Sequence, residues 1–223
     1  MSTPQAPGLD PAAEGVIDLL GVLAYGELTA FDRLAVDARL APTIAGRAAL
    51  ADMAAAELGH FRRLAGRLQE LGVDPEVAMR PFIAPLDAFH DSTRPANWLE
   101  SLVKAYVGDG IAADFYREIA GALDDSTRDL VLDALSDTGH AEFVVREVRA
   151  AIAADPSQAG RLALWARRLV GEALSQAQRV AADRDALILL LVQGSGDMTG
   201  IGALIKRVTS AHAVRLQGLG LSA

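Results

Sequence analysis

The sequence predicts an all-α protein, and three observations support this prediction. The 223-residue chain is 51% apolar and only 5% aromatic, a composition that suits closely packed helices. Apolar residues recur at helical spacing along most of the chain, without the alternation expected of β-strands. Proline, glycine and capping residues divide these periodic stretches into segments of helical length. We therefore expect a helical bundle with a sizeable core.

The first hairpin of the expected bundle follows a short N-terminal segment. Residues 1–11 are rich in Pro, Gly and Ala, and we expect them to be flexible. A long helix is predicted over residues 12–40, because Pro42 ends its periodic pattern. A second helix is predicted over residues 43–71 and ends before Gly72.

The segment 73–94 separates this hairpin from the next one. It is rich in proline and lacks long helical periodicity, so we expect an irregular crossover containing at most short helical turns. Two further helices are predicted over residues 96–123 and 124–154. Residues 12–154 are thus expected to form a four-helix bundle with a long crossover between its second and third helices.

The remaining residues, 155–223, are predicted to form a helical extension packed on the bundle. We expect a fifth helix over residues 158–191, a loop over 193–197 and a last helix over 198–217. The fifth helix has an apolar stripe that includes Trp165. That stripe must be buried, either against the bundle or in a dimer interface, and we expect a homodimer.

The two predicted hairpins contain matching polar residues. A carboxylate precedes a histidine by three positions on the second helix of each hairpin, and a further carboxylate lies about thirty positions earlier, with 30 and 28 positions between the two carboxylates. The six candidate metal ligands are Glu27, Glu57, His60, Asp109, Asp137 and His140. This repetition indicates a duplicated helical hairpin that presents two carboxylates and one imidazole in each copy.

Such a set of side chains is typical of a dinuclear metal centre inside a four-helix bundle. A carboxylate and a histidine three positions apart lie on one helix face and can contact one ion. Four carboxylates balance two divalent cations, whereas without metal they would repel one another at great cost. The alternative is an acidic hydrogen-bonded network with raised pKa values. The glycines beside these residues permit either close helix packing or access to the site: Gly26, Gly59, Gly108 and Gly139.

The ligand pattern resembles that of the ferritin-like di-iron carboxylate proteins over residues 12–154. Within that superfamily, the chain is most similar to the tRNA-2-methylthio-N6-isopentenyladenosine hydroxylase-like group, and its composition resembles that of an actinobacterial member. The resemblance implies a ferritin-like bundle and two iron ions, although mixed nitrogen and oxygen ligands also suit manganese or zinc. It further implies an O2-dependent hydroxylase that acts with an electron donor.

The resemblance also implies a role for each ligand. The flanking carboxylates would be Glu27 and Asp109, the bridging carboxylates Glu57 and Asp137, and the nitrogen ligands His60 and His140. Two of these positions, Asp109 and Asp137, depart from the usual Glu, and both lie in the second half. Aspartate is one methylene shorter, which leaves open whether the second half completes an active site. Asp114 and Glu118 are weaker substitutes, because Asp114 is expected to point away and Glu118 to lie at the rim or the surface.

Three functions therefore remain open. The first is a di-iron oxidoreductase of the hydroxylase type acting on an unknown small molecule. The second is a non-oxygenase protein that binds or oxidises iron. The third is a bundle with a degenerate site that acts by binding a partner. O2 consumption with a substrate, iron oxidation without one, and loss of the fold on chelation would distinguish them.

Composition and charge limit the kinds of site, the compartment and the partners that we expect. The chain has no cysteine, which excludes disulfides, thiolate ligands and iron–sulfur clusters. No secretory signal is recognised, and the longest apolar run, residues 186–192, is too short to cross a membrane, so we expect a cytoplasmic protein. The formal net charge of −8 disfavours nucleic acid as a partner, although the resemblance leaves tRNA open as a substrate.

Other residues with side chains of interest are expected to have structural roles. Tyr106 lies near the second half-site and is expected to fill the core, with lining of a pocket as the alternative. His90 is expected to act locally in the crossover, and His212 in the core or an interface.

Overall fold

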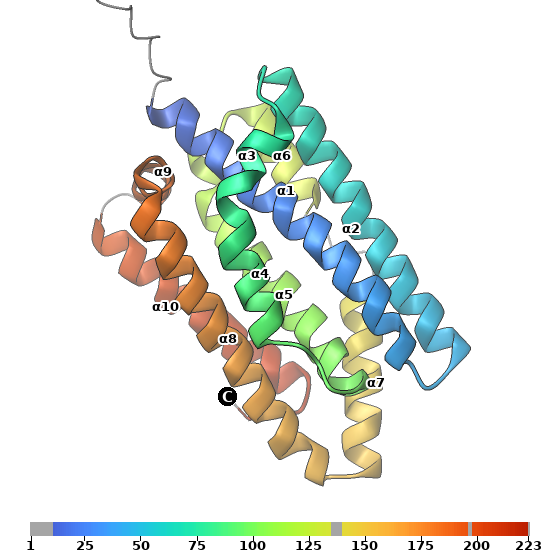
Figure 1. Cartoon of the computed structure of the whole chain (residues 1–223). Helices are drawn as coiled ribbons and strands as arrows, with labels where there is room; N and C mark the ends of the chain where they lie inside the picture. Colours follow the sequence, from blue (N-terminus) through green and yellow to red (C-terminus); the bar gives the residue numbers. More distant parts are fainter. Residues whose placement is uncertain (1–10, 135–139, 196–197, 223) are drawn as a thin grey trace, which may run out of the picture.

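The computed structural model confirms the all-α fold class (Figure 1). It contains no β-strand among the residues that the structure describes, which are 11–134, 140–195 and 198–222. The N-terminal residues 1–10, which we expect to be flexible, lie outside this described part. Pro11 begins the first helix. None of the described helices combines the length and the apolar character that a membrane span requires.

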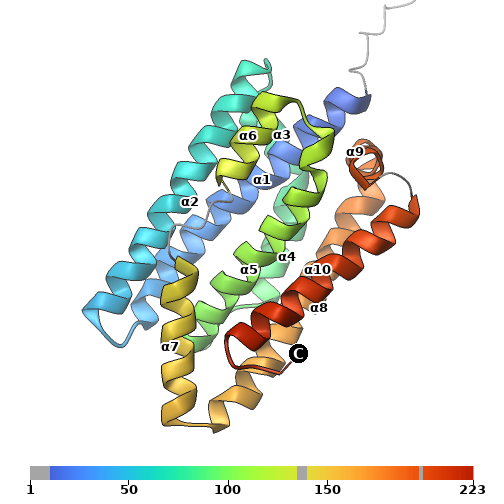
Figure 2. The same cartoon turned by 180° about the vertical axis from the view of Figure 1, so that it is seen from behind.

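The first hairpin consists of α1 (Pro11–Asp37) and α2 (Ile44–Glu70), as the sequence predicts. A short 3-10 turn, Ala38–Leu40, ends the first arm. Thr43 caps α2 by accepting a hydrogen bond from the backbone N–H of Gly46 over 3.0 Å, which satisfies one free donor at the helix start. The two helices lie side by side over nearly their whole lengths (Figures 1 and 2).

The crossover is more helical than the sequence predicts. It contains α3 (Pro75–Met79), a 3-10 turn (Arg80–Phe82) and α4 (Ile83–Ser92), so the expectation of an irregular segment is wrong. Asp74 caps α3 and the prolines occupy early helical positions, where a missing N–H costs nothing. Proline therefore marks helix starts here rather than a lack of helix.

The second hairpin begins with α5 (Trp98–Ile119), which Asn97 caps by accepting a hydrogen bond from the backbone N–H of Glu100. The predicted fourth helix is described as two helices, α6 (Asp125–Ala134) and α7 (His140–Ala154). The residues between them lie outside the described part of the chain.

The C-terminal part contains α8 (Ser157–Asp183), α9 (Asp185–Ser195) and α10 (Met198–Gly218). The single fifth helix and the loop expected after it are therefore wrong, because the chain breaks at Arg184 and α9 extends through most of that loop. Helix α8 packs on α4 and α5, and α10 packs on α5. Helix α9 is seen nearly end-on in both views, so it crosses its neighbours (Figures 1 and 2).

Close contact between α1 and α9 depends on a glycine. A Cβ atom at Gly15 would lie 2.6 Å from the carbonyl oxygen of Ala186, too close for any other residue without a shift of the backbone. The buried apolar residues form two clusters, one including Leu20 and Phe82 and the other including Leu50 and Leu102. Residues of both clusters line a cavity between them, and this cavity contains the candidate site.

Candidate metal centre

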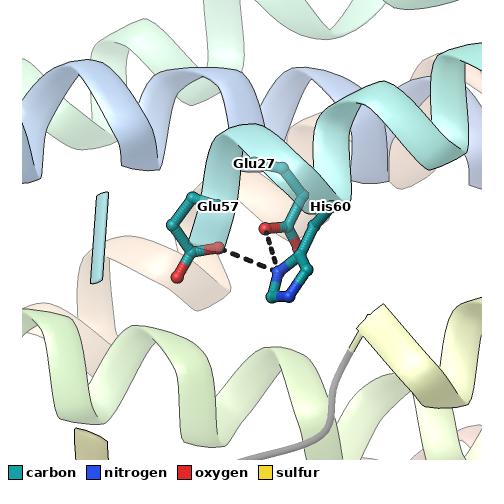
Figure 3. A group of neighbouring side chains, drawn as sticks. All are labelled: Glu27, Glu57 and His60. Atoms are coloured by element: carbon teal, nitrogen blue, oxygen red, sulfur yellow. Dashed lines mark hydrogen bonds and ion pairs between the residues drawn. The ribbon is translucent and has the colours of Figure 1, made fainter. Parts of the chain in front are cut away.

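The first hairpin brings three of the predicted ligands together (Figure 3). Glu27 comes from α1, while Glu57 and His60 project from one face of α2. The Nδ1 atom of His60 lies 3.2 Å from Oε2 of Glu27 and 3.3 Å from Oε2 of Glu57. All three side chains are largely buried, with exposed fractions between 10% and 13%.

Burial and mutual contact change the acid–base properties of this group. Burial raises the pKa of Glu57 to about 7, and the neighbouring Glu27 carboxylate acts in the same direction. The hydrogen bonds to Glu27 and Glu57 raise the pKa of His60 to about 9, against the effect of its own burial. In the absence of metal, these contacts therefore favour a protonated His60 imidazole beside Glu27 and Glu57 at neutral pH.

These residues fit a metal ion. One donor atom from each of Glu27, Glu57 and His60 lies within 4.8 Å of the other two, so one cation can contact all three. Carboxylate oxygen and imidazole nitrogen are suitable donors for iron, manganese and zinc. A divalent cation would also offset the two buried carboxylates that the His60 proton now offsets only in part.

The second hairpin places two more predicted ligands on the same cavity. Asp109 from α5 and His140 at the start of α7 both line the cavity, which has a volume of about 460 Å³ and also contacts Glu27, Glu57 and His60. Asp109 is exposed and His140 is half-buried. Within the part of the chain that the structure describes, the close three-residue group involves the first hairpin alone. Asp137 lies outside the described residues.

Asp114 does not point away from the site. It lines the same cavity and forms an ion pair with Arg215 of α10, so the sequence expectation for this residue is wrong. The side chain of Glu118 lies outside the described residues. Tyr106 also lines the cavity, and its hydroxyl oxygen would lie 3.6 Å from a Cβ atom built at Gly218.

Sequence reasoning missed the cations of the cavity wall, among them Arg33 on α1 and Lys104 on α5. A signal for Lys104 is present in the sequence, because it interrupts the apolar run from Leu102 to Val107. His90, expected to have a local role, contacts α1 through Nε2, which lies within hydrogen-bond distance of the Thr29 hydroxyl at 3.2 Å. His212 is 6% exposed, which agrees with a position in the core.

Comparison with known proteins identifies the family. A family model described as "Ferritin-like domain, actinomycetes" matches residues 11–194, so the chain belongs to this family. Among solved structures, the chain is similar to "Protein 19 with aldehyde deformylating oxidase activity from Synechococcus", with a TM-score of 0.65 and 22% identity over 95% of this chain and 98% of that chain. A search of curated proteins found no match. The predicted ferritin-like bundle with additional helices is thereby confirmed, and the structural likeness extends to the fold alone.

Proposed function

We propose that this protein binds two iron ions in the bundle and uses O2 to oxidise a small organic molecule in the adjoining cavity. The observation that supports this function most strongly is the buried group of Glu27, Glu57 and His60 at the wall of a cavity of about 460 Å³. A structural acidic network alone does not require a cavity of a size typical for ligands, about 300–1,000 Å³.

The proposed ligands divide between the two hairpins. Glu27, Glu57 and His60 would hold one side of the centre, and the Asp109, Asp137 and His140 set of the second hairpin the other. Bound ferrous iron would supply the electrons for O2 reduction. The protein's own part is to position the donors, to keep water from the buried Glu57 carboxylate and to hold the substrate beside them.

The cavity favours substrate oxidation over simple iron oxidation. Its wall includes apolar residues from both core clusters, such as Leu23 and Val144, which an iron-oxidising site does not need. Among substrates, the net charge of −8 favours a small molecule over tRNA, since an acidic surface repels a phosphate backbone. The hydroxylase-like resemblance agrees with this reaction type.

The test is O2 uptake by protein that has been loaded anaerobically with ferrous iron. An oxygen electrode should record uptake in proportion to bound iron, faster than by the same concentration of free ferrous ion. Glu57→Ala with His60→Ala is the matched variant, because it removes two donors while leaving the α1–α2 hairpin packing residues in place. Equal uptake by the wild type and this variant would contradict the proposal.

A further inference from the structure

Four cationic side chains line the cavity, of which Arg117 and Arg215 form ion pairs with Asp114. The other two, Arg33 and Lys104, lie at a distance from the candidate metal centre. Arg33 lies on α1 six positions after Glu27, and Lys104 lies on α5 five positions before Asp109. We propose that Arg33 and Lys104 bind the carboxylate of an organic acid whose apolar chain extends toward Glu27, Glu57 and His60. That the far end of the ligand reacts rests on the proposed function. The binding of its carboxylate depends only on the protein's own side chains.

Arg33 is incompletely satisfied within the described part of the chain, although the charge of Asp37 acts on it. It is half-buried and forms no hydrogen bond or ion pair within the described ranges of the chain. Its Nε atom is buried without a hydrogen-bond acceptor. An arginine side chain has five N–H donors arranged for planar, two-point contact with a carboxylate. A guanidinium that is withdrawn from water without an acceptor is costly, and a bound anion would offset that cost.

Lys104 is more deeply buried and only partly satisfied. It is 8% exposed, and its Nζ atom donates one hydrogen bond, over 2.9 Å, to the carbonyl oxygen of Thr93. The ammonium group also lies 5.4 Å from the centre of the Phe89 ring. An ammonium group has three donors, so this arrangement leaves donors for a ligand. Burial lowers the pKa of Lys104 to about 8, and the side chain is therefore still mainly charged at neutral pH.

The surrounding charges leave this end of the cavity positive. Asp37 is the cavity-lining carboxylate whose charge acts on both cations, and burial raises its pKa despite their attraction. His90 does not add to the positive charge, because burial and the charges of Lys104 and Arg33 lower its pKa to about 3. Asp91 and Arg94 also act on Lys104, but they pair with each other and their charges offset. Arg33 and Lys104 thus face the single carboxylate of Asp37, and a monoanionic ligand would complete the balance.

The distance between the two ends indicates the size of the ligand. Six residues of α-helix separate Glu27 from Arg33, which corresponds to about 9 Å along the axis of α1. The intervening wall includes the apolar side chains of Ala30, Leu34 and Met53. The chemistry therefore suits a medium-chain carboxylic acid, with its carboxylate on the cations and its far end at the candidate metal centre.

Isothermal titration of iron-loaded protein with hexanoate, octanoate and decanoate, each compared with its neutral amide, tests this inference. We expect at least one acid to bind about 10- to 100-fold more tightly than its amide, as for a charge-assisted hydrogen bond in a buried site. Arg33→Gln and Lys104→Met should each remove most of this preference. Arg39→Gln is the matched control, because Arg39 is exposed at the end of the same hairpin arm and does not line the cavity.

Metal content and melting temperature are measured on the same samples. Weakened acid binding with unchanged metal content and a cooperative melting transition would support the inference, even if the protein consumed no O2. Acid binding that survives both substitutions but is lost on chelation would place the carboxylate on the metal and overturn it. Acids that bind no more tightly than their amides would overturn it as well. A wild-type protein that retains no metal would count against the proposed function alone.

Discussion

The two halves of the candidate centre share a spacing in the sequence but differ in how deeply their described ligands are buried. In the first half, α1 and α2 are each continuous over 27 residues and bring Glu27, Glu57 and His60 into mutual contact. In the second half, Asp109 is exposed on α5, and His140 stands at the first position of α7. The close three-residue group is described for the first half only.

This difference shows that ligand spacing and ligand burial are separate properties. Spacing sets which residues share a helix face, whereas burial depends on how the helices pack around the ligands. In the α1–α2 hairpin, the three ligands have both the spacing and a buried position. We therefore expect the first half to bind metal more tightly than the second, since its donors are already oriented by the protein.

The largest expected effect is the loss of metal binding when the first half is removed. Glu57→Ala with His60→Ala should leave almost no bound iron, because one carboxylate cannot hold an ion on that side. Asp109→Ala should lower the iron content only in part, since the first half remains intact. Iron content is measured by plasma mass spectrometry, with the exposed Asp52→Ala on α2 as the control. Equal losses of iron in the two variants would contradict a tighter first half.

The next effect is a pH dependence of stability in the metal-free protein. The folded-state pKa of His60 is about 9, above its ordinary value of 6.5, so the stabilisation by its proton is fully present below pH 6.5 and is lost as the pH rises to 9. Urea unfolding should show a loss of roughly 3 kcal/mol across this window. Bound metal should abolish the decrease, because it replaces the proton.

His60→Gln supplies the comparison for that experiment. The variant should lack the decrease between pH 6.5 and 9, since glutamine does not titrate. A wild-type protein whose free energy of unfolding is constant over this range, with metal removed, would show that the two carboxylates do not hold the His60 proton as the structure indicates.

At the cationic end of the cavity, the free energy of unfolding is expected to change with pH in the opposite direction. Burial lowers the pKa of Lys104 from 10.5 to about 8, so the unfolded chain holds more protons between these values and stability rises with pH. The rise should reach roughly 2 kcal/mol between pH 8 and 9.5. Lys104→Met should lack it. The comparison uses metal-loaded protein, because in metal-free protein the His60 proton changes stability in the opposite direction up to pH 9.

The smallest effect concerns the glycines beside the ligands. A Cβ atom at Gly59 or Gly108 would meet no atom within 4 Å, which does not support close helix packing as the reason for either glycine. Gly59→Ala and Gly108→Ala should each stabilise the protein by about 1 kcal/mol through helix propensity. Thermal unfolding measures the change, and Gly15→Ala, which would crowd Ala186, should destabilise. Destabilisation by Gly59→Ala or Gly108→Ala would show that packing does require them.

Periodicity predicts the bundle and its long helices well, because apolar spacing and caps such as Thr43 are local signals. The helices of the crossover and the break at Arg184 are missed, since helix starts at prolines and helix ends without glycine give weak signals. At the site, the repeated pattern indicates Glu27, Glu57 and His60. The ion pair of Asp114 and the burial of the Arg33 Nε atom depend on which helices pack together, and spacing alone does not determine that.

The most direct test of the dinuclear centre is the iron content of the wild-type protein after anaerobic reconstitution with ferrous iron and removal of excess metal. The account predicts about two irons per chain. One iron per chain would show that the second half, with Asp109 and His140, does not complete the centre. No retained iron would contradict a metal role for Glu27, Glu57 and His60 altogether.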